Sequence, residues 1–425
     1  MVSLRRTRQL AGVLGASLAA AGCMTVGPSY RVPAQAVINA PAAQGDFTAA
    51  DTPAVTLAEP PADWWRLYRD PALDALVAKA LAANTDLRVA EANLERAQGL
   101  LNETRAAQQP DVNVNFNTAY TARSAEAYVH AGPIPTRELY DTGIGISYEV
   151  DLFGRIRRGV EAARAETEVA QAARDLARLN VVVETTRAYA EVCNAGAELD
   201  AARRTVDLQR QSLTLTRRLA AGGRSIDLDI ARQQQLVEQV RANVPALAAR
   251  QQNALYRLAT LTGRPPAEFD PSLASCHTAL RLDAPLPVGD GAALLKRRPD
   301  VRAAERQLAA STARIGVATA GLYPTVTLGG TLGTQGALSD FASALTDRYS
   351  IGPGVSWKLN QSVARARIAQ SKAQTQADLA RFDGAVLTAL REVETALTQY
   401  AHDLDRLAGL QAARDHAQKV AGGCS

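Results

Sequence analysis

The sequence has few of the residues from which enzyme cores and cofactor sites are usually built. Aromatic residues make up 5% of the 425 residues, and there are four cysteines and four histidines. No two cysteines form a CxxC pair, so their spacing offers no zinc or redox site. The histidines are scattered along the chain, at His130, His277, His402 and His416. We therefore expect no enzyme activity, no catalytic residue and no metal or other bound cofactor.

The sequence also lacks a strong charge imbalance and a long hydrophobic run. Its 47 Lys and Arg against 43 Asp and Glu leave a net charge of +4, which gives no reason to expect a nucleic acid partner. The apolar stretch from Leu10 to Ala21 is shorter than the roughly 20 residues that a membrane-spanning helix needs. This stretch is therefore not expected to span a bilayer in the mature protein.

The N-terminus instead has the features of an export signal. Three arginines lie within residues 1–9, the apolar stretch follows, and small residues then lead to Cys23. This ending resembles a bacterial lipobox, which predicts a lipoprotein signal peptide over residues 1–22 and a covalent lipid on Cys23. The alternative is a plain secretory signal with an incidental cysteine. The residues after Cys23 lack the aspartate of an inner-membrane retention signal, so sorting to the outer membrane is expected.

The other three cysteines are Cys193, Cys276 and Cys424. Cys193 continues an apolar seam in steps of three and four residues, so we expect it to be a small residue of a helical core. An oxidising compartment would allow a disulfide between Cys276 and Cys424, although their spacing does not specify one.

The chain repeats itself at a fixed separation. Identical residues occur 214 positions apart at Asp86 and Asp300, Arg88 and Arg302, Glu91 and Glu305, Leu94 and Leu308, and Pro110 and Pro324. A match over a whole helix and its closing proline indicates an internal duplication. In both copies, small or apolar residues recur in alternating steps of three and four, which predicts helices with coiled-coil packing.

After each of these helices the pattern changes to that of a strand. Val112, Val114 and Phe116 alternate with asparagines, and a second alternating run covers 144–150. The second copy repeats this hairpin between 324 and 359. Such alternation is typical of outer-membrane barrel strands, and equally of a soluble hairpin packed on helices. Four strands are too few to close a barrel, so a barrel would have to be shared among subunits.

Long helices account for most of the remaining chain. The proline-free stretch from about residue 155 to 219 predicts a rod close to 100 Å long, at about 1.5 Å per residue. Pro245 predicts a kink in the helix that returns from it. Before the first strand, a break near Asn84 separates two helices, and Thr85 or Asp86 is expected to cap the second of them.

These patterns predict a mainly α-helical protein with a small β part and two internal repeats. The expected segments are the signal peptide at 1–22, an extended periplasmic tether at 23–63, a first repeat at 64–262, a linker at 263–290 and an incomplete second repeat at 291–425. Within the repeats we expect β-hairpins at 111–150 and 324–359, a long helical hairpin at 155–261 and a final helix to about 420. The prolines of the tether predict that it wraps the protein rather than packing into it.

Several longer motifs carry a family resemblance. They are DPxLDxLVxxALxxN at 70–84, SYEVDLFGRIRR at 147–158, LTGRPP at 261–266 and LLKRRPDVRAAE at 294–305. Together with the lipobox, they resemble the outer-membrane factor family, the TolC-like channels of tripartite exporters. The match is closest to the lipoprotein subgroup that serves efflux pumps of the resistance-nodulation-division (RND) type.

The resemblance implies an architecture and a set of partners. It implies a homotrimer in which each protomer gives four strands to one shared transmembrane β-barrel, while its long helices form an α-helical coiled-coil barrel across the periplasm. The function implied is a passive efflux duct of the outer membrane. The implied partners are further copies of the chain, a periplasmic adaptor (membrane fusion) protein, an inner-membrane RND pump and outer-membrane lipid.

The sequence departs from the family in its second copy. No counterpart of the glycine turn at 222–225 or of its returning helix follows the second hairpin, so we expect a chain truncated at its C-terminal end relative to the family. Asn360 to Ser362 replace the Phe-Gly turn that joins strand to helix in the first copy. The competing hypothesis is therefore a truncated, lipid-anchored, coiled-coil periplasmic protein without channel activity. Arg297 and Arg298 are expected on a solvated helix start and are not predicted to bind a ligand.

The turn between the long helices is the predicted functional site. Gly222 and Gly223 end the first helix, and Ser225 or Asp227 is expected to cap the next. The resemblance implies that Gly222, Gly223 and Ser225 contact the adaptor. Asp227 and Asp229 have two open interpretations: gate acids that form a cation-favouring ring in a trimer, or a helix cap and a first-turn acid without further function.

Overall fold

The computed structural model describes residues 25–122, 124, 132, 135–341 and 343–422. The predicted signal peptide, the lipidation residue Cys23 and Cys424 lie outside these residues. The chain forms two compact units, one made of the residues up to 36, 95–169 and 303–384, and the other of 37–94, 170–302 and the residues from 385 onward. Each unit therefore combines segments of both repeats. In the described part of the chain, no helix is long and apolar enough to cross a membrane.

The duplication read from the sequence is present in the structure. Helices α4 (Thr85–Ala106) and α9 (Pro299–Ala320) each contain 22 residues, and both their ends keep the 214-residue offset. The strands that follow them, β2 (Asp111–Thr121) and β5 (Thr325–Ala337), begin at the same offset. The repeat thus extends to the boundaries of the elements.

Asn84 caps helix α4, so the prediction that Thr85 or Asp86 does so is wrong. Asn84 lies between α3 (Pro71–Ala83) and α4, and its backbone is extended. Its Oδ1 accepts hydrogen bonds from the backbone N–H groups of Asp86 at 2.9 Å and Leu87 at 3.2 Å. Because an N-cap residue must itself lie outside the helix, the boundary one residue earlier moves the cap to Asn84.

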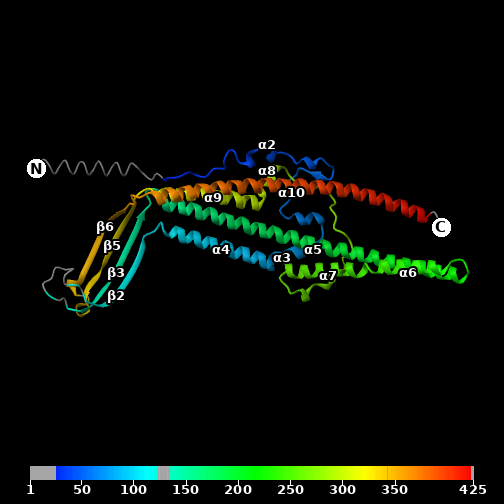
Figure 1. Cartoon of the computed structure of the whole chain (residues 1–425), viewed down its shortest axis with the longest axis horizontal. Helices are drawn as coiled ribbons and strands as arrows, with labels where there is room; N and C mark the ends of the chain where they lie inside the picture. The colour runs from blue at the N-terminus through cyan, green and yellow to red at the C-terminus, as the bar shows by residue number, and fades with distance from the viewer. Residues whose placement is uncertain (1–24, 123, 125–131, 133–134, 342, 423–425) are drawn as a thin grey trace. The chain divides into compact units, whose positions relative to one another are not determined.

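Four antiparallel strands form one sheet, in the order β2-β3-β5-β6 (Figure 1). Strand β3 covers Arg137–Val150 and β6 covers Asp347–Ser356, so all four strands lie within the predicted hairpin ranges. The two hairpins meet through β3 and β5, where Ile144 pairs with Leu332. The outer strands β2 and β6 each have one strand neighbour within this sheet.

Long helices make up most of the rest of the chain. Helix α5 (Arg155–Ala221) has 67 residues, and α10 (Ser362–Gly422) has 61. The helix that returns from α5 is divided into α6 (Asp227–Arg241) and α7 (Val244–Leu261). The division lies just before Pro245, because the proline ring lacks an N–H and clashes with the preceding turn. The predicted kink is therefore present as a break.

Helix α9 packs against α5 through a row of ion pairs. The pairs are Arg302 with Asp175 at 2.8 Å, Arg306 with Glu168 at 3.1 Å, and Arg314 with Glu166. The Tyr30 hydroxyl also donates to Glu305 of α9 at 2.8 Å. Helix α4 contacts α5 through a weaker polar link, in which the Thr167 hydroxyl donates to the Ala97 carbonyl at 3.3 Å.

The segment that precedes α3 packs into the protein, which corrects the prediction of an extended tether that only wraps around it. Phe47 is 5% exposed and lies in a core cluster with Leu294 and Leu397. Strand β1 (Val55–Thr56) pairs in parallel with β4 (Leu286–Pro287) of the linker. Prolines restrict backbone hydrogen bonding, but the apolar residues between them still gain free energy by burial.

The first described residues of the chain are also held in place. Arg158 of α5, whose side chain is 6% exposed, donates to the carbonyls of Val26 at 3.2 Å and Gly27 at 3.0 Å. Gly27 has a φ of +87°, and a Cβ on it would lie 2.4 Å from Cα of Gly316 in α9. Only glycine permits this approach. The buried arginine therefore anchors this segment beside α9.

Cys193 forms a disulfide with Cys276, so the suggested Cys276–Cys424 pair is wrong. Cys193 is fully buried on α5, as expected for a core residue, and the two Cα atoms are 4.6 Å apart. A turn at Pro271–Ser275 brings Cys276 to the helix. Gly196 allows this contact, since a Cβ there would lie 2.4 Å from the Cys276 carbonyl oxygen.

The remaining elements are short. They are η1 (Val37–Asn39), α2 (Pro41–Gln44), η2 (Thr48–Ala50), η3 (Trp64–Tyr68), η5 (Pro266–Glu268), η6 (Pro271–Ser275), α8 (Gly291–Arg297), η7 (Leu338–Asp340) and η8 (Ala344–Thr346).

The two strand-to-helix turns use different chemistry. In the first copy, Gly154 has a φ of +79°, which favours glycine, and α5 begins at the next residue. In the second copy, Asn360 Oδ1 accepts hydrogen bonds from Ser362 N–H at 3.1 Å and from its hydroxyl at 2.7 Å. An Asx turn at Asn360 therefore leads into α10 without the Phe-Gly pair of the first copy.

Candidate functional site

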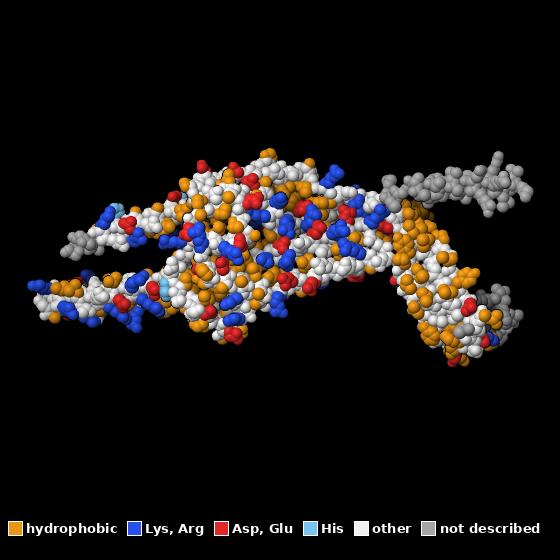
Figure 2. All heavy atoms as spheres, turned by 180° about the vertical axis from the view of Figure 1, so that it is seen from behind, with side chains coloured by type: hydrophobic (Ala, Val, Ile, Leu, Met, Phe, Trp, Pro, Cys, Tyr) orange, Lys and Arg blue, Asp and Glu red, His pale blue; other side chains and the backbone are white. Residues whose placement is uncertain are grey.

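One face of the sheet is apolar on all four strands. A cross-strand row of its exposed side chains consists of Val114 (75% exposed), Ile144 (47%), Leu332 (68%) and Tyr349 (84%). Figure 2 shows hydrophobic side chains covering much of the visible surface of the strands. A contiguous apolar face of this kind marks a surface that is covered by lipid or by another protein.

The other face of the same sheet is polar and rich in glycine. The row opposite to the apolar one consists of Asn115, Gly143, Gly333 and Arg348. Asp141, on this face, accepts a hydrogen bond from Asn115 Nδ2 at 3.0 Å and forms an ion pair with Arg348. The sheet thus separates an apolar side from a hydrophilic side, as the strands of an outer-membrane barrel do.

The predicted turn site lies at the end of α5, where α6 returns alongside it (Figure 1). The Arg224 N–H donates to the Leu219 carbonyl at 2.8 Å, and the Gly223 N–H donates to the Ala220 carbonyl at 2.9 Å. This is a Schellman motif, and Gly223 supplies its left-handed residue with a φ of 73°. Gly222 has no such backbone requirement. The four residues from Ala221 to Arg224 are exposed, so the turn is accessible.

The acids of this turn have unequal environments. Ile226 is the N-cap residue of α6, so the prediction that Ser225 or Asp227 caps the helix is wrong. Isoleucine has no side-chain acceptor, and Asp229 Oδ2 instead accepts from the Ser225 hydroxyl at 3.0 Å and the Ile226 N–H at 3.4 Å. Asp229 is therefore engaged in holding the turn, whereas Asp227 is exposed in the first helical turn. Both acids are stabilised there by the helix dipole.

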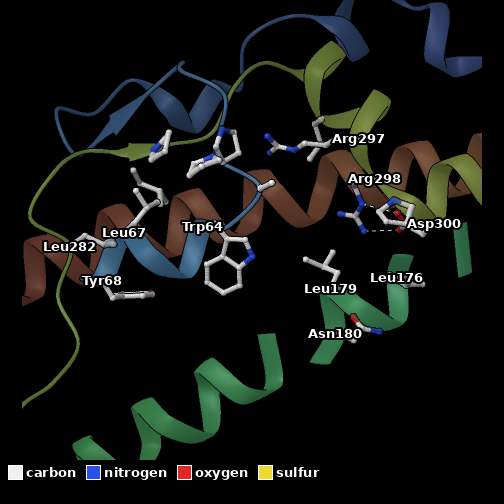
Figure 3. A pocket seen from close by; sticks show the side chains of 17 residues that line it. Trp64, Leu67, Tyr68, Leu176, Leu179, Asn180, Leu282, Arg297, Arg298 and Asp300 are labelled. Atoms are coloured by element: carbon white, nitrogen blue, oxygen red, sulfur yellow. Dashed lines mark hydrogen bonds and ion pairs between the residues drawn. The ribbon is translucent and has the colours of Figure 1, made fainter. Parts of the chain in front are cut away.

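A pocket of about 580 Å³ lies in the compact unit that contains residues 170–302 (Figure 3). Its lining is mainly apolar and includes Trp64 of η3, Leu176 and Leu179 of α5, and Pro287 of β4. Arg297, at the end of α8, also lines it. Sequence reasoning missed this pocket, because its walls come from segments that are far apart in the chain.

Arg298 is held by two carboxylates, so the prediction that it lies on a solvated helix start is wrong. Its side chain is 22% exposed. Nε and Nη2 donate to the Asp300 carboxylate at 3.0 and 2.7 Å, and Nη2 also donates to Glu392 at 2.8 Å. Burial is the largest single influence and would raise the pKa of Asp300, but the hydrogen bonds and charge of Arg298, together with backbone N–H groups, outweigh it and leave the pKa lowered. Asp300 is thus a carboxylate with its charge already compensated.

Among the described residues, no group of three or more His, Cys, Asp or Glu side chains is arranged to hold a metal ion. The candidate functional features are an amphipathic sheet, an exposed turn between two helices and an apolar pocket.

Comparison with known proteins identifies the family. The family model described as outer membrane efflux protein matches residues 76–264 and 292–422. The fusaric acid resistance protein FusA of Burkholderia cepacia is 32% identical over 351 residues, which cover 81% of this chain and 65% of that protein. The probable outer membrane lipoprotein SilC of Salmonella typhimurium is 26% identical over 388 residues, which cover 89% of this chain and 80% of that protein. The chain thus spans slightly less than two thirds of FusA.

A solved structure supports the same assignment. The outer-membrane channel OprN superimposes with a TM-score of 0.85 at 34% identity, over 93% of this chain and 88% of that chain. The family match covers both repeats and most of the residues between 76 and 422. The resemblance inferred from the motifs is confirmed: the chain belongs to the outer membrane efflux protein family and is located in the outer membrane.

Proposed function

We propose that the chain is one subunit of a passive, homotrimeric efflux channel that leads from the periplasm to the exterior. The observation that carries the proposal is the four-stranded sheet, which has one apolar face, one polar face and two outer strands with one neighbour each. Pairing β2 of one copy with β6 of the next would satisfy both edges and close a barrel. The likeness to the channel OprN supports this role.

The proposed channel has further components. A lipid on Cys23 would fix the chain to the outer membrane, and the relative named probable outer membrane lipoprotein SilC supports this. We assign Gly222, Gly223 and Ser225 to the contact with a periplasmic adaptor, since the two glycines lie in the exposed turn and the partly exposed Ser225 follows it. An inner-membrane RND pump would supply the energy. Asp227 is the better candidate for a gate acid, because Asp229 is already bound within the turn.

One observation favours the second candidate, a lipid-anchored coiled-coil protein without channel activity. The last turns of α10 expose Leu407 (50%), Leu410 (59%) and Val420 (70%). Exposed apolar residues along a helix suit a coiled-coil contact with another helix. Under this hypothesis the chain would not assemble a complete tunnel.

Cysteine crosslinking and conductance separate the two candidates. Asn113→Cys on β2 is combined in turn with single cysteines along the polar face of β6, such as Ser350→Cys, in a Cys424→Ser background. The channel predicts a crosslinked ladder that ends at the trimer and single-channel conductance of the purified protein in planar bilayers. Monomers without conductance would support the second candidate and exclude the channel. The pair Asn113→Cys and Gly145→Cys, which are partners within one sheet, is the intramolecular control.

A further inference from the structure

We propose that the pocket beside Arg297 binds a small organic anion with an aliphatic chain, of the kind represented by a medium-chain carboxylate. Nothing in the channel function requires such a site, so the inference is independent of it. The volume of about 580 Å³ lies within the roughly 300–1,000 Å³ typical of small-molecule sites.

The walls of the pocket suit a hydrocarbon. Trp64, Leu67 and Tyr68 contribute from η3, and Leu176 and Leu179 contribute from α5. Figure 3 shows Trp64 and Leu179 on one side and Arg297 on the other. Leu179 is 38% exposed, so part of this apolar surface is in contact with water. An aliphatic chain that covers this surface would gain hydrophobic free energy.

The charge of Arg297, which lines the pocket, favours an anion over a neutral ligand. The only hydrogen bond of the Arg297 side chain within the described residues is the one from Nη2 to the Val288 carbonyl, at 3.2 Å. No described carboxylate lies within 4.0 Å of it. Glu59 acts on it only at longer range, and burial lowers the pKa of the Arg297 guanidinium. Because a guanidinium has five N–H donors, most of those on Arg297 remain for a bound carboxylate.

The neighbouring arginine provides an internal comparison. Arg298 also lines the pocket, but its bonds to Asp300 and Glu392 compensate its charge. The acid in the lining, Asp300, is compensated by the same bonds and contributes little repulsion toward an anion. The net charge available at the pocket is therefore that of Arg297, next to an apolar wall. That combination is complementary to a molecule with one negative head group and one apolar tail.

Calorimetric titration with octanoate tests the proposal, with the assembled full-length protein held in lipid nanodiscs and empty nanodiscs as the blank. Octanamide, which has the same chain without the charge, is the ligand control. Arg297→Gln removes the charge at the pocket, and Lys296→Gln is the matched control, because Lys296 lies on the same helix but does not line the pocket. Leu179→Glu places a repelling acid in the apolar wall at a position that is already partly exposed.

We expect saturable octanoate binding that is about tenfold or more weaker in Arg297→Gln, as for the loss of a charge-assisted hydrogen bond, and unchanged in Lys296→Gln. Octanamide should bind the unaltered protein about as weakly as octanoate binds Arg297→Gln. Leu179→Glu should abolish octanoate binding while the circular dichroism spectrum stays unchanged. Equal binding of octanoate and octanamide, or no effect of Arg297→Gln, would overturn the proposal. Absence of saturable binding would also overturn it.

Discussion

Helices α4 and α9 occupy equivalent positions in the two repeats, yet their surroundings differ. Among the residues of α4, only Leu87 and Leu101 are buried, whereas α9 buries residues along its whole length, including Leu308 and Ser311 at 1% exposure. On α4, Val89 is 60% exposed and Leu100 is 47% exposed. Duplication has thus preserved the backbone and the register but not the packing. Helix α9 is largely covered by other parts of the chain, while α4 leaves apolar side chains exposed.

The largest expected difference concerns Leu308 and its counterpart Leu94. Leu308→Ala should destabilise the protein by about 2–5 kcal/mol, because it leaves a cavity in a closed core. Leu94→Ala removes the same atoms from a partly exposed site, where the loss of unfolding free energy should be no more than about half as large. Thermal unfolding of the detergent-solubilised protein, followed by circular dichroism, measures both. Equal losses would show that the difference in burial has no energetic consequence.

The next difference concerns Gly316 and its counterpart Asn102. In Gly316→Ala the new Cβ would lie 2.7 Å from Cγ of Arg158, whose buried side chain holds the segment at residues 26–27. We expect the free energy of unfolding to fall by about 1–3 kcal/mol, as for overpacking, and proteolysis before residue 30 to become faster. Asn102 is exposed, and Asn102→Ala should change neither the free energy of unfolding nor the rate of proteolysis. Unchanged proteolysis in Gly316→Ala would argue against the role of Arg158 as an anchor.

A smaller effect is expected for the ion pair of Arg302. Its partner Asp175 lies at 2.8 Å, and both side chains are partly exposed, at 39% and 27%. Solvent screening should limit the cost of Arg302→Gln to about 0.5–1 kcal/mol. The counterpart Arg88 is exposed, and Arg88→Gln should be neutral. The stability change caused by Arg302→Gln should be smaller in 1 M salt, because salt screens the ion pair. A stability change that is the same at low and high salt would indicate a loss of packing instead.

The smallest effect on subunit stability is expected for Val89→Asp. Because Val89 is exposed in the single subunit, the substitution should change its unfolding free energy by less than about 0.5 kcal/mol. If the apolar surface of α4 is buried in the proposed trimer, the same substitution should lower the trimer fraction in native mass spectrometry. Gln98→Asp introduces an acid at an exposed polar position of α4 and serves as the control. An unchanged trimer fraction in Val89→Asp would place the subunit contact elsewhere.

The regular part of the fold could be predicted from the sequence because it depends on local periodicity. The offset of 214 residues, the four strands and the break before Pro245 follow from the spacing of residues along one element. The apolar and polar faces of the sheet follow from alternation in the same way. The glycine turn was predictable because left-handed backbone favours glycine, as it does at Gly223.

The features that were missed depend on contacts between distant segments. Cys193 and Cys276 are 83 residues apart, and the apolar seam around Cys193 gave no sign of a partner. The carboxylates that hold Arg298 include Glu392, 94 residues away. The pocket of Arg297 is assembled from η3, α5, the linker and α8, so no single stretch of sequence contains its pattern. The cap of α6 was missed because identifying a cap residue requires knowing where the helix begins to within one residue.

The Cys193–Cys276 disulfide has a consequence for motion in the helical hairpin. It closes a covalent ring that contains the second half of α5, all of α6 and α7, and the start of the linker. Near the ring closure, Gln251 of α7 also donates to the Ala274 carbonyl at 3.0 Å. Toward the turn, the one side-chain hydrogen bond between α5 and α6 among the described residues joins Ser212 to Gln233 at 3.5 Å, and Val237 of α6 is buried. The disulfide therefore fixes the two helices of the hairpin to each other near Cys193. The end that carries Gly223 has fewer links between the helices and is the part freer to move.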